Sequence, residues 1–157
     1  MKYAEQTTVS SERSRAEIET ILGRYGATSF AYMWQGTTAL ILFEYKEKRI
    51  RFMLKLPSRD DKKIKYTPER GTVRSREAQE KAYEQAVRQK WRALALVIKA
   101  KLEAVESGIS VFEEEFMANI VLPNGQTTAE YMIPQINEAY RLGQMPPMLP
   151  MLNGGAK

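Results

Sequence analysis

The chain has 157 residues, 43% of them hydrophobic and 27% charged, with a formal net charge of +5. This size and composition are typical of one globular domain, so we treat residues 1–157 as a single domain. Because cysteine and histidine are both absent, disulfides, Cys/His zinc sites, thiol nucleophiles and Ser-His relays are excluded from this chain. No apolar run approaches the ~20 residues of a membrane span, and the first residues do not resemble a secretion signal. We therefore expect a soluble cytoplasmic protein with no membrane partner.

The charge is distributed unevenly along the chain. Residues 46–101 hold eighteen Lys/Arg against seven Asp/Glu, a net charge of +11, whereas residues 1–45 carry −1 and residues 102–157 carry −5. A local excess of this size is typical of a protein that binds a polyanion. The alternative, more common for any single run of charge, is a solvated basic surface.

Residues 14–56 are predicted to form a helix followed by a small sheet. Ser14-Arg15-Ala16-Glu17 fits a capping box, in which the serine and glutamate side chains bond each other's backbone N–H groups, and predicts a helix over residues 15–24. Three β-rich segments follow within residues 29–56, with turns at Gln35-Gly36 and at residues 46–49. Short connections favour antiparallel neighbours, so we predict a three-stranded antiparallel meander.

Residues 57–74 lose all periodicity and are predicted to be a basic, exposed loop. Residues 75–107 carry one long helical pattern, with Ser75 as its N-cap. Its apolar residues step by three or four and predict the buried face of a central helix whose basic first half projects beyond the sheet. These residues are Tyr83, Val87, Trp91, Leu94, Ile98, Leu102 and Val105.

Two further helices are predicted within residues 110–143. Ser110 to Glu113 and Thr127 to Glu130 both fit the capping box, and Pro134 is expected to bend or interrupt the second helix. Residues 144–157 are predicted to be an extended, apolar, proline-rich tail that either straps over the core or docks on another chain. The expected class is α+β, with an N-terminal helix, a three-stranded meander, a long central helix, two C-terminal helices and this tail.

The basic residues of the second hairpin, the loop and the long helix are the candidate site. Positive charge neutralises phosphates, and Tyr66 among these cations suits stacking on a base. Lys90 points elsewhere on the helix than Arg88 and Arg92, which are neighbours on one face. The candidate nucleic-acid-binding residues are Lys48, Arg49, Arg51, Arg59, Lys62, Lys63, Lys65, Arg70, Arg74, Arg76, Arg88, Arg92 and Tyr66.

Enzymatic patterns are weak. Glu44-Tyr45-Lys46 has the E-x-K form of metal-dependent nucleases, but those sites also need a preceding acidic ligand, and no aspartate precedes Asp60. The run of glutamates at 113–115 cannot converge on one ion, because consecutive helical residues point about 100° apart. We therefore expect no catalytic residues, no metal ligands and no cofactor. A Mg²⁺-dependent nuclease that uses Glu44 and Lys46 is the remote alternative.

In element order and charge, residues 27–107 resemble the core of the Rad52-like phage single-strand annealing proteins. The segments SRAEIETILGRYGA and RQKWRALALVIKAKLEAVESG are also similar to small proteins of phages and mobile elements. The resemblance implies a hairpin and a long helix that bound a positively charged DNA groove on a ring or filament.

We hypothesise a non-enzymatic nucleic-acid-binding protein of a phage or mobile element. Its basic loop and long helix would hold a phosphate backbone, single-stranded or distorted, either as a monomer or as a homo-oligomer. The alternative is a protein-interaction module that docks on a host or phage protein through the basic loop or the apolar tail.

Overall fold

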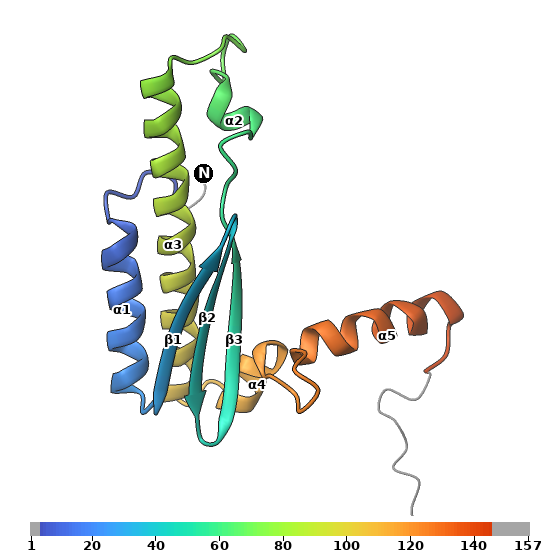
Figure 1. The fold of residues 1–157 in the computed structure, drawn as a ribbon. Helices are drawn as coiled ribbons and strands as arrows, with labels where there is room; N and C mark the ends of the chain where they lie inside the picture. Colours follow the sequence, from blue (N-terminus) through green and yellow to red (C-terminus); the bar gives the residue numbers. More distant parts are fainter. Residues whose placement is uncertain (1–3, 146–157) are drawn as a thin grey trace, which may run out of the picture.

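The computed structural model describes residues 4–145 and has an α+β fold. Its sheet forms one layer, and helices α1 (Ser11–Arg24) and α3 (Arg76–Glu106) form the second (Figure 1). The one-turn helix α2 (Lys62–Lys65) lies beside the start of α3. We call this end, residues 59–81, the tip.

The opposite end is closed by the short helix α4 (Phe112–Phe116) and the 3₁₀ turn η1 (Met117–Asn119), and we call it the base. Helix α5 (Thr128–Leu142) leaves the base and extends away from the two layers (Figure 1).

The predicted antiparallel meander is confirmed. Strands β1 (Ser29–Gln35), β2 (Thr38–Tyr45) and β3 (Lys48–Lys55) pair in sequence order. The register places Phe43 between Phe30 and Ile50. Side chains alternate between the two faces of a strand, so the apolar side chains that this register aligns all lie on the sheet face that packs against the helices.

The turn between β2 and β3 holds two non-glycine residues in the left-handed region. Lys46 has φ 46° and Glu47 has φ 62°. Two-residue hairpin turns use this conformation because it matches the twist of the strands, and they usually place Asn and Gly there. The sheet here adopts it with side chains that disfavour it.

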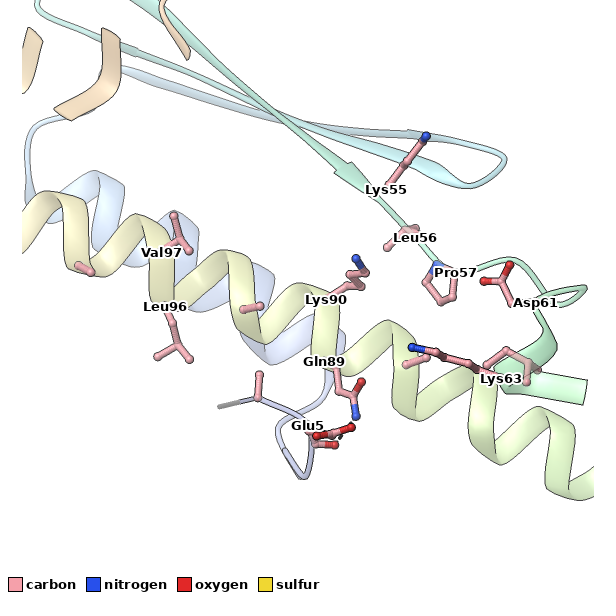
Figure 2. A pocket seen from close by; sticks show the side chains of 15 residues that line it. Glu5, Lys55, Leu56, Pro57, Asp61, Lys63, Gln89, Lys90, Leu96 and Val97 are labelled. Atoms are coloured by element: carbon pink, nitrogen blue, oxygen red, sulfur yellow. Dashed lines mark hydrogen bonds between the residues drawn. The ribbon is translucent and has the colours of Figure 1, made fainter. Parts of the chain in front are cut away.

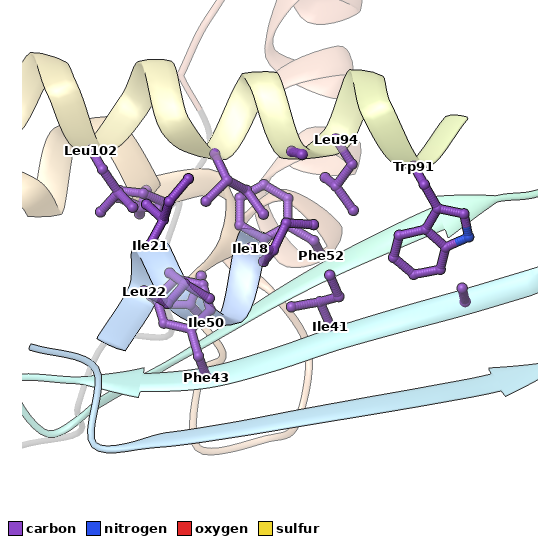
Figure 3. Close-up of a cluster of buried hydrophobic side chains, with 14 of the residues drawn as sticks. Ile18, Ile21, Leu22, Ile41, Phe43, Ile50, Phe52, Trp91, Leu94 and Leu102 are labelled. Carbon is purple, nitrogen blue, oxygen red and sulfur yellow. The ribbon is translucent and has the colours of Figure 1, made fainter. Parts of the chain in front are cut away.

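The core lies between the inner sheet face and the two long helices (Figure 3). Ile18 and Leu22 of α1, Ile41 and Phe43 of β2, and Trp91 of α3 are almost completely buried. The ring of Trp91 meets Tyr32 edge to face, with centroids 5.3 Å apart. The predicted buried face of the long helix is confirmed at Trp91, Leu94, Ile98 and Leu102, and Val87 and Val105 pack at its margin.

An aromatic cluster closes the base. Phe116 is fully buried and its ring lies 4.6 Å from Phe112, 6.0 Å from Phe43 and 6.2 Å from Phe52, measured between centroids. The segment after η1 is tied to β3, because the backbone N–H of Val121 donates to the carbonyl of Arg49 at 2.8 Å. Such contacts between rings add to the free energy gained by burying them.

Helix α5 begins at the predicted capping box. Thr127 Oγ1 accepts from the N–H of Glu130 at 3.2 Å, and the Glu130 carboxylate accepts from the N–H of Thr127 at 2.8 Å. The prediction that Pro134 interrupts this helix is wrong, because α5 runs continuously from Thr128 to Leu142. A proline without an N–H leaves the carbonyl four residues earlier without its helical donor, which one helix can accommodate.

Three local predictions are wrong. Helix α1 begins a turn before Ser14, because Ser10 Oγ caps it by accepting from the N–H of Arg13 at 3.1 Å, and Ser14 is buried inside the helix. Ser110 forms no capping box, since α4 starts after Val111 without a side-chain cap and lasts five residues. The predicted loop 57–74 contains α2 and a bridge between Tyr66 and Val73.

The predicted tail lies, from residue 146 on, outside the described residues.

Candidate nucleic-acid interface

Two of the candidate cations join separate parts of the fold. Lys48 Nζ at the start of β3 lies 3.2 Å from Glu113 of α4, and the backbone N–H of Glu113 together with Lys48 lowers the pKa of that carboxyl. Arg92 Nη1 on α3 lies 2.5 Å from Glu17 of α1, with both side chains less than one-third exposed. These charges are neutralised by carboxylates from elsewhere in the chain, so they hold the helices and the sheet together.

Arg51 anchors the start of α5 in the same way. Its Nη2 lies 2.5 Å from the Glu130 carboxylate, and its Nη1 donates to the carbonyl of Gly125 at 3.1 Å. The N–H of Thr127 and the guanidinium of Arg51 hold the pKa of Glu130 below its usual value. Arg51 therefore fixes where α5 leaves the base and is not available to a phosphate without breaking this contact.

Two further candidates pair with carboxylates on their own or the adjacent element. Arg49 lies 3.6 Å from Glu44, opposite it on the neighbouring strand. Arg88 lies 3.4 Å from Glu84, one turn earlier on α3. Exposed pairs of this kind add little to stability, and their cations keep access to solvent.

Arg59 binds back onto α3 at the tip. Its Nη2 donates to Glu80 at 2.9 Å, and its guanidinium lies 4.3 Å from the centroid of the Tyr83 ring. This bond lowers the pKa of Glu80 and raises that of Arg59. Arg76 lies on the same side and lines a separate hollow with Arg59 and Glu80. The structure therefore does not bring Arg59 and Arg76 together with the other loop cations.

The remainder of the predicted loop is folded by local bonds. Lys65 Nζ lies 2.7 Å from Asp60, which lowers the pKa of that carboxyl. Arg74 Nε donates to the carbonyl of Tyr66 at 3.1 Å and so closes the turn between them. This turn presents the Tyr66 ring, which is 40% exposed, on the surface.

Lys62, Lys63, Arg70 and Arg76 differ from the other candidates. Within the described part of the chain their side chains form no hydrogen bond or ion pair, and all four are exposed. Lys62 and Lys63 line a cleft of about 690 Å³ together with Tyr66, Arg74 and the single carboxylate Glu5, and we call it the tip cleft. Residues 59–81 contain eight Lys/Arg and five Asp/Glu, so the tip keeps a net charge of +3.

A second, larger cleft of about 870 Å³ continues from the tip cleft along α3, and we call it the α3 groove. Figure 2 shows it bounded by the connection after β3 on one side, with Lys63 and Lys90 pointing into the space between that connection and α3. Ala86, Ala93 and Ala100 line it at seven-residue spacing. Lys90 therefore belongs to this groove, whereas Arg88 and Arg92 are paired elsewhere.

The sequence pattern does not single out Lys55, which also lines the α3 groove. The signal that would have found the groove is the series Ala82, Ala86, Gln89, Ala93, Leu96 and Ala100, which steps by four and three beside the buried face. Alanine is a strong helix former anywhere, so such a series by itself indicates helix propensity and not a second uncovered face.

The structure gives no support to the nuclease alternative. Glu44 lies beside Arg49, and Lys46 occupies the turn, 5.4 Å from the ring of Tyr45. Within residues 4–145 no group of three or more acidic side chains is arranged to hold a metal ion.

None of the helices between residues 4 and 145 combines the length and apolar character that crossing a bilayer requires. Comparisons of the chain with protein-family models, with curated proteins and with solved structures find no match.

Proposed function

We propose that the protein binds nucleic acid through the tip cleft. The observation that carries the proposal is the grouping of three cations without a carboxylate partner among residues 4–145 near the exposed ring of Tyr66: Lys62 and Lys63 line the cleft with it, and Arg70 lies in the turn that follows it. Unpaired cations can bind phosphates without first losing an internal bond. This separates them from cations such as Arg51, which hold the fold together.

The expected ligand is single-stranded. A ring that lies beside cations stacks on an unpaired base, and such stacking does not depend on sequence. In a duplex the bases are already stacked on each other, so Tyr66 would contribute little. Affinity for single strands should therefore exceed affinity for a duplex of the same length.

The test is a fluorescence-anisotropy titration of the full chain with single- and double-stranded oligonucleotides over a series of salt concentrations. In the tip variant, Lys62, Lys63 and Arg70 are each changed to glutamine. We expect its affinity to fall about tenfold or more. The slope of log affinity against log salt should shrink by up to about 3, one for each phosphate that the variant no longer neutralises.

The matched control removes the same amount of charge elsewhere. Arg24, Lys46 and Lys99 lie outside the tip, and changing all three to glutamine lowers the net charge equally. We expect a much smaller decrease in affinity for this control. Equal decreases in both variants would show that only the overall charge matters, and no binding by the unmodified chain at low salt would refute the proposal.

Tyr66 tests the preference for single strands. We expect Tyr66→Ala to weaken single-strand binding by about 1–3 kcal/mol and duplex binding much less. Tyr66→Phe keeps the ring and should restore the affinity. If the alanine variant binds single strands as well as the unmodified protein, the ring does not stack on a base.

A further inference from the structure

Helix α5 carries an apolar stripe whose later residues, Ile133, Ile136 and Tyr140, are exposed, whereas Ala129 and Met132 near its start are half-buried. Ala129, Met132, Ile133, Ile136 and Tyr140 recur at helical spacing and lie on one face, which we call the α5 stripe. Ile133 is 53%, Ile136 38% and Tyr140 87% exposed. An amphipathic helix normally gains its stability by burying this face, so an uncovered stripe indicates a missing partner.

The α3 groove is an uncovered apolar surface on the same molecule. Ala93 and Ala100 are exposed at its floor, and Leu96 and Val97 flank them. Residues seven apart lie on one helical face, and small side chains there let another helix approach closely. The groove thus offers a helix the contact that the α5 stripe lacks.

The two surfaces match in length. The stretch of α3 from Ala86 to Ala100 is about 21 Å long at 1.5 Å per residue, and α5, with 15 residues, is about 22 Å. A helix laid along α3 would therefore cover most of the groove. Helix-in-groove contacts of this kind use apolar anchors spaced three and four residues apart, as in the α5 stripe.

The charges of the two regions are complementary. The α3 groove is edged by Lys55, Lys63 and Lys90, none of which has an ion pair with any of residues 4–145, and by the carboxylates Glu5 and Asp61, so its charged lining has a net charge of +1. Helix α5 carries Glu130, Glu138 and Arg141 and so has a net charge of −1. The contact therefore joins two surfaces of opposite net charge.

The α5 of the same chain is held away from the groove. The bonds of Arg51 to Glu130 and Gly125 fix its first turn at the base, and from there the helix extends away from α3 (Figure 1). An α5 helix that fills the groove must then come from another molecule, and a second copy supplies one of the required length, apolar pattern and sign of charge.

We propose that the α5 stripe of one copy docks into the α3 groove of a second copy. The contact joins two different surfaces, so a pair of copies retains one free groove and one free stripe, on different copies, and the contact can repeat from copy to copy. This self-association does not depend on nucleic acid and stands whether or not the tip cleft binds it.

The first test measures mass against concentration for the full chain by sedimentation velocity, without nucleic acid. We expect the mass to rise with concentration. Ile136→Glu places a charge in the stripe and Ala93→Glu places one on the groove floor, and both sites are exposed, so the fold is retained. Each variant alone should remain a monomer.

An equimolar mixture of the two variants gives the sharpest result. The Ile136→Glu copy keeps an intact groove and the Ala93→Glu copy keeps an intact stripe, so we expect the mixture to form a dimer that grows no further. Met53→Glu, a matched change on the outer face of the sheet, where Met53 is 59% exposed, should leave self-association unchanged.

Three results would overturn the proposal. One is an unmodified chain that stays monomeric at all concentrations. Another is self-association of Ala93→Glu alone, as expected if α5 helices pair with each other or dock on the sheet. The third is an equimolar mixture that stays monomeric although each variant has a native circular dichroism spectrum.

Discussion

At the base, cations bond to carboxylates from other elements and surround a packed aromatic cluster. At the tip, five of the eight Lys/Arg have no carboxylate partner among residues 4–145, and Ile64 is the buried apolar residue of α2. Both ends come from the same basic part of the sequence. Burial explains the pairing of Arg51, whose side chain is 21% exposed, because a cation near a core is stable only when it is paired, whereas the more exposed Lys48 pairs because α4 places Glu113 beside it. Density of positive charge along the chain therefore does not show which cations are free of internal partners, because the fold decides which of them are paired.

The largest expected effect is at the base. Phe116→Ala removes a fully buried ring that contacts three other phenylalanines, and we expect it to lower the free energy of unfolding by about 3–5 kcal/mol. Urea unfolding followed by tryptophan fluorescence measures this. Tyr66→Ala at the tip is the matched aromatic change and should cost less than about 0.5 kcal/mol. Similar decreases for the two variants would remove the distinction between the ends.

The second effect concerns a cation that joins two elements. Arg92→Met leaves the Glu17 carboxylate without its partner between α1 and α3, and we expect a decrease of about 1–2 kcal/mol in unfolding free energy. A double-mutant cycle with Glu17→Gln isolates the pair itself. A coupling energy of zero between Arg92 and Glu17 would mean that this pair does not stabilise the fold.

A smaller, local effect should appear in acid. The folded-state pKa of Glu130 is lowered, first by the N–H of Thr127 and then by Arg51. The contribution of ionised Glu130 to the free energy of unfolding is therefore fully present above the pKa of the unfolded chain, about 4.3. This contribution is lost as the pH falls through the lower pKa of the folded state. NMR should show the first turn of α5 loosening in this range before the core unfolds. Glu130→Gln should abolish this acid-dependent step while leaving the remaining resonances unchanged.

The smallest effect on stability is expected at the tip. Changing Lys62, Lys63 and Arg70 to glutamine breaks no bond within residues 4–145, so the unfolding free energy should change by no more than about 0.5 kcal/mol. The same variant should bind nucleic acid more weakly, which separates function from folding. A marked drop in the thermal midpoint would mean that these cations support the fold.

Periodicity in the sequence predicts the helices and strands well, because the alternation of β3 and the three-four steps of α3 each reflect one buried face. Capping is less predictable. Thr127 to Glu130 and Ser14 to Glu17 show the same pattern, yet Ser10 caps α1 first and leaves Ser14 in its interior. A short motif cannot show which of two nearby serines begins a helix.

The division of the basic residues is beyond prediction from one sequence. Glu17 and Arg92 are 75 positions apart, and only the fold brings them into contact. No pattern in the sequence predicts where α2 packs, either. Its position sets Lys62 and Lys63 beside Ala82 and Ala86 of α3, in a cleft that Glu5 of the N-terminal segment also lines.

The turn at Lys46 and Glu47 bears on how the sheet selects its alignment. Left-handed backbone costs a side-chain-bearing residue about 1–2 kcal/mol, so these two residues do not favour this hairpin over its alternatives. A shift of β3 by a single position would turn Ile50 and Phe52 outward and empty the space that they fill against α3 and α4. The alignment of the hairpin is thus chosen by distant helices, and the turn follows it.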